Sequence, residues 1–310
     1  MNDSRSIAPG VRGRVPMALA AAALVACGGG GGGGGGGGTP EQAPFNIVAA
    51  GDIGHCDGAP AATTRAAATA ALVRPDDLVV LTLGDSTYPV GAPAEFRDCF
   101  DPTWGAFKDR IRPTVGNHEY LTPGAEGYYA YFGAAAGPER RGYYSFDVRG
   151  WHFISLNSNV DASPGSAQAQ WLAADLASSA RSRCTLAYWH YPVFSSGLHG
   201  NIAQMARTFE TLQAAGVDVV LVGHDHHYER FAPQTAAAQP DPARGIRAFV
   251  VGTGGAELYP LVTVRANSEF RDNSRHGVLR MTLSADRYSW QFVPADGGAP
   301  RDAGSAACHD

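Results

Sequence analysis

The chain has 310 residues, of which 45% are hydrophobic and 17% are charged, a composition that suits one large globular domain or two small ones. Its 24 basic and 29 acidic residues give a formal charge of −5, and no run of basic residues occurs beyond the N-terminal segment. Nucleic acid as the main partner is therefore disfavoured, because binding to a phosphate backbone needs a basic face.

The first 27 residues have the composition of an export signal. Arg5, Arg12 and Arg14 precede an apolar stretch over residues 15–26, which is too short to span a bilayer as a mature helix. The segment closes on Leu-Val-Ala-Cys at Cys27, which resembles the bacterial lipoprotein box, whose cysteine is lipidated and becomes the mature N-terminus. We expect an exported protein that is anchored in the cell envelope through Cys27. An ordinary secretory signal, which would give a soluble periplasmic or secreted protein, is the alternative.

A run of glycines over residues 28–38 follows the signal. Polyglycine cannot offset the entropy that ordering costs, so residues 28–44 are predicted to form a flexible tether. No other linker divides the chain. We therefore predict one folded domain over residues 45–295 and a C-terminal tail over 296–310, irregular after Pro294.

Apolar runs and helical segments alternate along the predicted domain. The predicted strands cover residues 45–50, 78–83, 112–115, 151–156, 185–188, 217–222 and 246–251. The predicted helices cover residues 61–73, 166–180 and 202–215, and residues 277–293 are typical of a terminal hairpin with a turn at 284–286. Most of the strand segments are continuously apolar, as in sheets buried on both faces, and the alternation indicates a layered α/β domain.

Four cysteines remain beyond the signal, and an exported chain reaches an oxidising compartment in which cysteines tend to pair. Four cysteines allow three connectivities. Cys56 and Cys99 each follow closely on a predicted strand or its helix, which favours their pairing and leaves Cys184 with Cys308. No Cys-x-x-Cys spacing occurs in the sequence, so a zinc ribbon has no support.

Polar side chains stand directly after five of the predicted strands, at the edge where ligands bind in open α/β sheets. Taken singly, each could serve as a turn residue, a helix cap or a structural histidine. As an ordered set they supply oxygen and nitrogen donors suited to two divalent or trivalent ions, and one carboxylate can bridge both. The set consists of Asp52, Asp85, Asn117, His190, His224 and His226.

These residues lie in five ordered motifs, GDIG, GDSTY, GNHE, HYP and GHDHHYER. The series resembles the calcineurin-like metallophosphoesterase superfamily and, within it, the purple acid phosphatase branch, over roughly residues 45–295. The resemblance implies a four-layer α/β/β/α sandwich with a two-metal centre, and it makes the predicted domain the catalytic one.

The resemblance also implies a role for each motif residue. The first metal is assigned to Asp52, Asp85, Tyr88 and His226. The second metal is assigned to Asn117, His190 and His224, with Asp85 as the bridge. The position of Tyr88, three residues after Asp85, matches a tyrosine that ligates ferric iron, so the implied pair is Fe³⁺ with Zn²⁺, Mn²⁺ or Fe²⁺. His118 and His199 match histidines that contact the substrate.

The first motif departs from that of most metallophosphoesterases, which carry Asp-x-His where this chain has Asp52-Ile53-Gly54-His55. The shift favours Tyr88 as the additional ligand, and His55 remains a candidate for contact with the metal or the substrate. Three further histidines, at 152, 276 and 309, are expected to be structural or solvent-facing. His227 would point away from His226 in an extended segment, so we expect a packing or surface role for it.

The implied reaction is attack of a metal-bound hydroxide on phosphorus in line, without a phosphoenzyme. His118 and His199 would stabilise the phosphate oxygens or protonate the leaving group. We predict a phosphomonoesterase acting on a small phosphorylated substrate, with no nucleic-acid partner and with membrane contact only through the lipid anchor. Phosphodiester hydrolysis at the same metals is the first alternative. An envelope module that binds metal or phosphate without turnover, and a surface protein with incidental histidines, are the others.

Overall fold

The computed structural model describes residues 43–56, 58–179 and 183–309. The predicted signal with Cys27 and almost all of the predicted tether lie outside the described residues. Every element named below belongs to one compact unit, Glu41–Asp310. Among the helices of the described ranges, none has both the length and the apolar character needed to cross a membrane.

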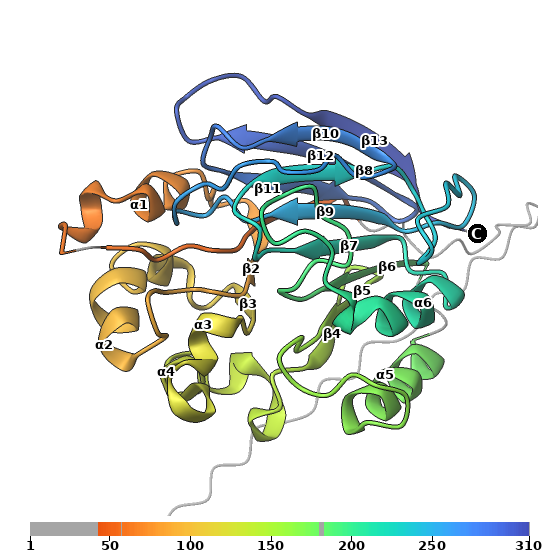
Figure 1. Ribbon diagram of the computed structural model, residues 1–310, viewed down its shortest axis with the longest axis horizontal. Helices are drawn as coiled ribbons and strands as arrows, with labels where there is room; N and C mark the ends of the chain where they lie inside the picture. The colour runs from red at the N-terminus through yellow and green to blue at the C-terminus, as the bar shows by residue number, and fades with distance from the viewer. Residues whose placement is uncertain (1–42, 57, 180–182, 310) are drawn as a thin grey trace, which may run out of the picture. The chain divides into compact units, whose positions relative to one another are not determined.

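The described part of the chain forms two sheets, which pack face to face around a shared apolar core (Figure 1). The first has the order β13-β12-β11-β1-β2-β3, with β1, β2 and β3 parallel and the other three added antiparallel. Its strands are β1 Phe45–Ala50, β2 Asp77–Leu83, β3 Ile111–Thr114, β11 Gly277–Leu283, β12 Arg287–Pro294 and β13 Ala303–Ala307.

The second sheet has the order β10-β8-β9-β7-β6-β5-β4, and its four central strands β9, β7, β6 and β5 are parallel. Its strands are β4 Tyr144–Val148, β5 Trp151–Ser155, β6 Cys184–Tyr188, β7 Val219–Val222, β8 Tyr228–Phe231, β9 Arg247–Val251 and β10 Ser268–Asp272.

Helices cover the outer face of each sheet (Figure 1). The α-helices are α1 Arg65–Ala70, α2 Pro93–Glu95, α3 Asn117–Tyr120, α4 Glu126–Phe132, α5 Ala167–Ser178 and α6 Ala206–Ala214. Shorter 3-10 turns are η1 Ala61–Thr63, η3 Trp104–Phe107, η4 Pro123–Ala125, η5 Gly133–Ala136, η6 Pro138–Arg140 and η7 Ala203–Met205, and η2 Phe96–Phe100 is a π-helical turn. The longest helix, α5, begins where the Ser166 hydroxyl accepts the Ala169 N–H at 3.2 Å, an N-cap that satisfies one free backbone donor.

Three apolar cores follow from the period-two alternation of the strands. In β1, Ile47 faces the core between the two sheets, whereas its neighbour Val48 faces the core under α1 and α4. In β7, Leu221 faces the inter-sheet core and Val220 faces the core under α5 and α6. The resulting layers are helix, sheet, sheet and helix, so the predicted four-layer sandwich is confirmed.

The predicted strands match observed strands to within two residues at each end, and the terminal hairpin is formed by β11 and β12. The helix predicted over residues 61–73 is instead the short turn η1 followed by α1, which ends at Ala70. Strands β4, β8 and β10 were not predicted.

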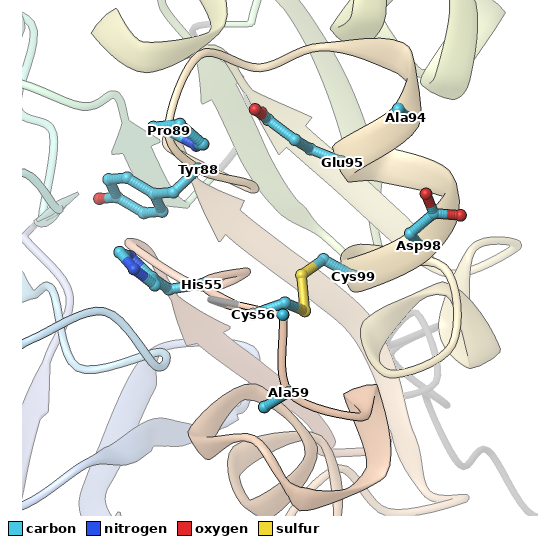
Figure 2. Close-up of a pocket in the computed structure, with 10 residues that line it drawn as sticks. His55, Cys56, Ala59, Tyr88, Pro89, Ala94, Glu95, Asp98 and Cys99 are labelled. Atoms are coloured by element: carbon cyan, nitrogen blue, oxygen red, sulfur yellow. A yellow bond between two sulfur atoms is a disulfide. The ribbon is translucent and has the colours of Figure 1, made fainter.

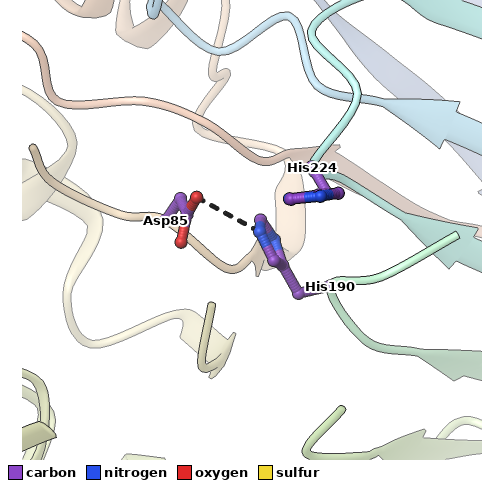
Figure 3. Close-up of side chains that lie close together, drawn as sticks. All are labelled: Asp85, His190 and His224. Carbon is purple, nitrogen blue, oxygen red and sulfur yellow. Dashed lines mark ion pairs between the residues drawn. The ribbon is translucent and has the colours of Figure 1, made fainter. Parts of the chain in front are cut away.

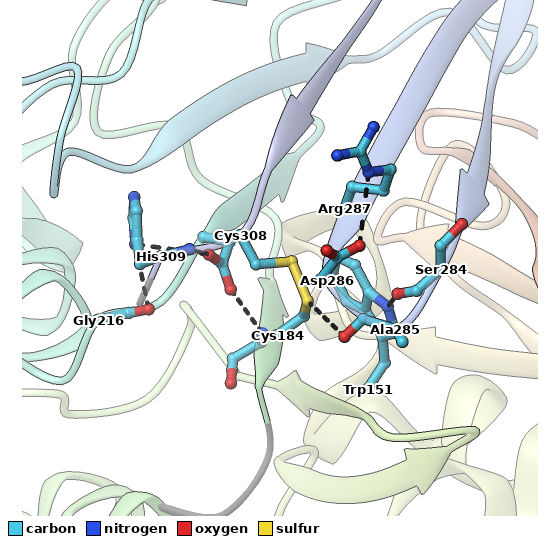
Figure 4. The surroundings of a disulfide bond; sticks show 11 residues. Trp151, Cys184, Gly216, Ser284, Ala285, Asp286, Arg287, Cys308 and His309 are labelled. Carbon is cyan, nitrogen blue, oxygen red and sulfur yellow. Dashed lines mark hydrogen bonds and ion pairs between the residues drawn. A yellow bond between two sulfur atoms is a disulfide. The ribbon is translucent and has the colours of Figure 1, made fainter. Parts of the chain in front are cut away.

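The prediction of an irregular tail after Pro294 is wrong, because β13 pairs antiparallel with β12. Small residues without a hydrophobic pattern form β13, so its strand conformation comes from this pairing and from the disulfide that follows it. Cys308 bonds to Cys184 at the start of β6 and thereby ties the two sheets together (Figure 4). Cys56 bonds to Cys99, and both predicted disulfides are therefore present in the structure.

Candidate metal centre

Seven side chains that the sequence assigned to metals converge at the carboxyl ends of parallel strands. Asp52 follows β1, Asp85 and Tyr88 follow β2, and Asn117 follows β3 in the first sheet. The second sheet delivers His190 after β6, and His224 and His226 after β7. The centre is thus built from both sheets, at the edge where their strand-end loops meet.

The hydroxyl of Tyr88 is the meeting point of the first predicted ligand set. Its Oη lies 3.0 Å from Asp52 Oδ1, 3.2 Å from Asp85 Oδ2 and 3.1 Å from His226 Nε2. Tyr88 is 7% exposed and Asp52 is fully buried, so bulk solvent screens the charges of this group only weakly.

Asp85 also reaches the second predicted set through the same oxygen. His190 Nε2 lies 3.2 Å from Asp85 Oδ2 and 3.0 Å from the Asn117 side-chain oxygen. The His224 ring completes this group, with one ligand atom each of Asp85, His190 and His224 within 4.8 Å of one another (Figure 3). Asp85 therefore stands between the two sets, where a bridging carboxylate would stand.

Backbone carbonyls orient two of the histidines. His190 Nδ1 lies 2.8 Å from the Leu83 carbonyl oxygen, and His226 Nδ1 lies 2.6 Å from the Glu257 carbonyl oxygen. A neutral ring that donates from Nδ1 presents the lone pair of Nε2 to the centre, the arrangement that fixes the tautomer of metal-binding histidines.

Three residues of the centre have backbone conformations that non-glycine residues seldom adopt. The φ angles are +60° at Asp52, +47° at Asp85 and +71° at His224. The backbone also packs so closely against both carboxylates that there is no room for a side chain at two neighbouring glycines. A Cβ atom on Gly116 would lie 2.0 Å from Asp85 Oδ1, and one on Gly223 would lie 2.7 Å from Asp52 Oδ2. Such strain is tolerated where it places functional groups, and here it brings both carboxylates into one small volume.

Charge in the centre is not balanced by basic side chains. Within the described residues, neither Asp52 nor Asp85 forms an ion pair with Lys or Arg; their charged partners are histidines. Burial and the nearby carboxylates raise the pKa of Tyr88 well above its usual value. Burial lowers the pKa of His190, but the charge and hydrogen bond of Asp85, together with the charge of Asp52 and the Leu83 carbonyl, outweigh it and raise that pKa to about 9. Burial and His190 lower the pKa of His224 to about 3.

The contacts among these side chains indicate that the donor set suits metal cations. The Tyr88 hydroxyl carries one hydrogen, yet two carboxylate oxygens and a ring nitrogen of His226 lie within 3.2 Å of its oxygen, so these contacts need a further proton or a metal cation. The contact between His190 Nε2 and Asp85 Oδ2 likewise needs a proton or a cation between its atoms. Carboxylate, phenol, amide and imidazole donors together suit Fe³⁺, Zn²⁺ and Mn²⁺.

The two predicted substrate histidines flank the ligands. His118 Nδ1 lies 2.6 Å from the Pro89 carbonyl oxygen, and its Nε2 lies 3.9 Å from Asp85 Oδ2 on a half-buried ring. His199 is exposed and its ring stacks on His224, with the ring centroids 4.4 Å apart and 30° between the planes. Both imidazoles are therefore next to the ligands and accessible from solvent.

His55 lies outside the ligand cluster, beside a cavity of about 420 Å³. Figure 2 shows the rings of His55 and Tyr88 on one side of this cavity, and Glu95 with the Cys56–Cys99 disulfide on the other. The ring centroids of His55 and Tyr88 are 5.7 Å apart. His55 thus lines this cavity next to the predicted ligand Tyr88.

The other histidines hold the fold. His227 is fully buried, and its Nε2 lies 3.0 Å from Glu229 Oε2. This position agrees with the packing role that we expected for it. His152, His276 and His309 form hydrogen bonds with carboxylate or backbone carbonyl groups rather than with any of the seven predicted ligands.

One buried acid of the site was missed by the sequence reasoning, although it lies within the GNHE motif. The carboxylate of Glu119 accepts backbone N–H groups of Asp85 at 3.0 Å, Ser86 at 2.6 Å and Gly116 at 2.7 Å. It thereby ties the loop after β2 to the loop after β3. The signal in the sequence was an acidic residue two positions after Asn117, within the GNHE motif.

Comparison with known proteins agrees with this geometry. The calcineurin-like phosphoesterase family matches residues 45–228. Purple acid phosphatase 21 of Arabidopsis thaliana is 30% identical over 282 residues, which cover 82% of this chain and 60% of that protein. The chain therefore spans less than two thirds of this curated relative.

Two solved structures share the fold. A purple acid phosphatase from seeds of yellow lupin, Lupinus luteus, has a TM-score of 0.65 and 18% identity, over 86% of this chain and 54% of the lupin chain. GAP50, the anchor in the inner membrane complex of Plasmodium, has a TM-score of 0.68 and 14% identity, over 87% of this chain and 90% of its own. The predicted resemblance to metallophosphoesterases of the purple acid phosphatase branch is confirmed, and the chain belongs to the calcineurin-like phosphoesterase family.

Proposed function

We propose that this protein is a phosphoric ester hydrolase with a two-metal centre, and that it prefers phosphomonoesters of small molecules. The observation that carries the proposal is the position of Asp85, one oxygen of which lies 3.2 Å from both Tyr88 Oη and His190 Nε2. This carboxylate joins two donor sets, as a bridging ligand between two cations would. The similarity to purple acid phosphatases supports the same reaction class.

In the proposed centre, Asp52, Asp85, Tyr88 and His226 would hold one ion, and Asn117, His190 and His224 would hold the other together with Asp85. When bound, two such ions neutralise phosphate charge and make a water molecule acidic enough to attack near neutral pH. The protein keeps the ligands in place through the Leu83 and Glu257 carbonyls, which orient His190 and His226.

His118 and His199, which solvent can reach, supply the protons and hydrogen bonds that the proposed metal ligands cannot. His118 keeps Nε2 on the side of Asp85, because its Nδ1 contacts the Pro89 carbonyl. When protonated, His118 can donate to a phosphate oxygen. His199, stacked on His224 at the solvent side, is placed to give a proton to the leaving oxygen.

Turnover of an aryl phosphomonoester and of the matching aryl phosphodiester by the metal-loaded protein tests the proposal. We expect two metal ions per chain by elemental analysis and faster turnover of the monoester. Asp85→Asn should lose metal and turnover together, whereas His199→Ala should keep the metal and lower kcat. Faster turnover of the diester would assign a phosphodiesterase, and bound metal without turnover of either ester would assign a binding module.

Tyr88 allows the metal pair to be identified by colour. We propose Fe³⁺ in the set that contains Tyr88, paired with Zn²⁺, Mn²⁺ or Fe²⁺. A tyrosinate bound to Fe³⁺ gives a visible charge-transfer band, and Tyr88→Phe should remove that band while leaving iron detectable. A colourless, active protein without iron would overturn the assignment and point to a pair such as zinc or manganese.

We also propose that residues 45–295 act as a catalytic domain outside the cytoplasm, tethered by residues 28–44 to a lipid on Cys27. The two disulfides support export, because disulfides persist in oxidising compartments. Mass spectrometry of the mature N-terminus should find a lipidated cysteine, and Cys27→Ser should release the protein from membranes. A mature chain that begins elsewhere, without lipid, would indicate the ordinary secretory signal.

A further inference from the structure

The segment after β7 makes two separate sets of contacts. His224 and His226 face the metal centre, as described above. The residues between and after them face the loop over residues 195–200: Asp225 accepts hydrogen bonds from that loop, and Glu229 accepts the Ser196 N–H at 2.8 Å. One short segment therefore supplies two predicted ligands and also anchors the loop that carries His199.

The ring of His199 has little to hold it directly. Its contacts are the stacking on His224 and an edge contact with Tyr259, whose ring centroid is 5.4 Å away. No hydrogen bond involves the His199 ring within the described ranges. The loop over 195–200 also contains no helix or strand. The place of the imidazole therefore depends on how firmly the backbone beneath it is fixed.

Asp225 fixes that backbone. Its carboxylate is fully buried and accepts the N–H of His199 at 2.9 Å, the N–H of Gly200 at 3.1 Å and the hydroxyl of Ser195. The approach is close, because a Cβ on Gly197 would lie 2.6 Å from the Asp225 carboxyl carbon. In the described part of the chain Asp225 has no Lys or Arg partner, so these loop donors are what stabilise its buried charge.

We propose that Asp225 is a positioning residue that holds His199 against His224, so that the imidazole stands beside the leaving group of a bound phosphate ester. The inference rests on the proposed function for the role of His199. In the step it serves, water oxygen bonds to phosphorus, the ester P–O bond breaks, and the leaving oxygen takes a proton from the His199 imidazolium. The proton that the water loses passes to solvent, from which His199 is protonated again.

The exchange of Asp225 for Asn keeps the shape of the side chain but replaces one acceptor oxygen with an NH₂ group, which cannot accept the donors it faces. The matched control is Asp218→Asn. Asp218 is also a buried carboxylate that accepts two backbone N–H groups, from Thr185 at 2.8 Å and His309 at 2.6 Å, but it lies at the opposite end of β7.

The first readout is hydrogen exchange of backbone amides in the full-length, metal-loaded protein. We expect D225N to speed exchange of the His199 and Gly200 amides by roughly tenfold or more, since their acceptor is weakened. D218N should leave both amides unchanged. Ser195→Ala, which removes one donor and no charge, should give a smaller effect in the same direction and serves if D225N does not fold. Unchanged exchange in both Asp225 and Ser195 variants would overturn the inference, whether or not the protein is a phosphatase.

The second readout separates positioning from general damage. A leaving-group acid matters most for esters of poor leaving groups, so D225N should lower kcat for an alkyl phosphate by roughly tenfold to a hundredfold and affect a nitrophenyl phosphate far less. Metal content should stay at the wild-type value. In a His199→Ala background, D225N should cause no further loss. Additive losses, or equal losses for both esters, would refute the role of Asp225 while leaving the proposed hydrolase intact.

Discussion

Glu119 offers the sharpest test of how the centre is held together. Its Oε2 accepts the N–H groups of Asp85 and Gly116, and its Oε1 accepts that of Ser86. In Glu119→Gln, the amide oxygen can take the place of Oε2, and the NH₂ group then meets the Ser86 N–H. One charge-assisted hydrogen bond is lost, worth about 1.5–3 kcal/mol, and the other two weaken to neutral ones.

The expected loss in the free energy of unfolding is therefore about 2–5 kcal/mol. Burial, and after it the charge of Asp85, raises the pKa of Glu119 to about 8. Most of the metal-free protein thus carries a protonated Glu119 at pH 7, and the loss there falls toward the lower bound.

Urea unfolding of the metal-free protein at pH 7, followed by fluorescence, measures this difference. The control is Glu126→Gln, an exposed side chain paired with Arg140 at 2.6 Å, for which we expect less than about 1 kcal/mol. If Glu119→Gln costs no more than this control, the three backbone contacts do not stabilise the two loops and the reasoning fails.

Three further results are expected. Asp77→Ala should cost about 3–5 kcal/mol in urea unfolding, because it removes the carboxylate that lies 3.0 Å from the guanidinium of the buried Arg280, whereas the exposed Asp98→Ala should leave the unfolding midpoint at the wild-type value; equal effects would contradict this. Burial lowers the pKa of His152, but the hydrogen bonds that its ring donates to Asp175 and a second carboxylate outweigh burial and raise that pKa. Their contribution to stability is therefore full below about pH 6.5 and is lost as pH rises through the folded pKa. Melting curves from pH 6 to 9 should show this loss, and Asp175→Asn should flatten it; parallel curves would argue against it. Chelation of bound metal should lower the melting temperature, since ligands that bind only the native state stabilise it, and readdition should restore it; an unchanged midpoint would speak against a preformed site.

The fold was largely predictable wherever apolar runs mark strands that are buried on both faces. β1 was predicted with its observed bounds, and the hairpin of β11 and β12 was recognised from its turn. β13 was not predicted because its small residues have no hydrophobic pattern. An edge strand of this kind exists only because a neighbour offers backbone hydrogen bonds and a disulfide fixes its end.

The ligand positions were predictable for a related reason. Parallel strands gather their carboxyl ends at one edge of a sheet, so polar residues that follow them in sequence meet in space. The period-two rule also separated His226 from His227, which is buried against Glu229. Glu119 and Asp225 could not be assigned in the same way, because their partners are backbone N–H groups in loops that are distant in the sequence.

The sequence by itself determined the strand-end motifs, the family they resemble and the donor types available to a metal. Only the tertiary structure decided that Asp85 lies between two donor sets, that two carboxylates and a histidine surround the Tyr88 hydroxyl, and that a buried aspartate next to a predicted ligand histidine accepts hydrogen bonds from the loop of His199. The physical reason is that motifs encode local conformation and chemistry. Distances of 3 Å between loops arise when two sheets pack and their backbones supply the hydrogen bonds that fix each carboxylate.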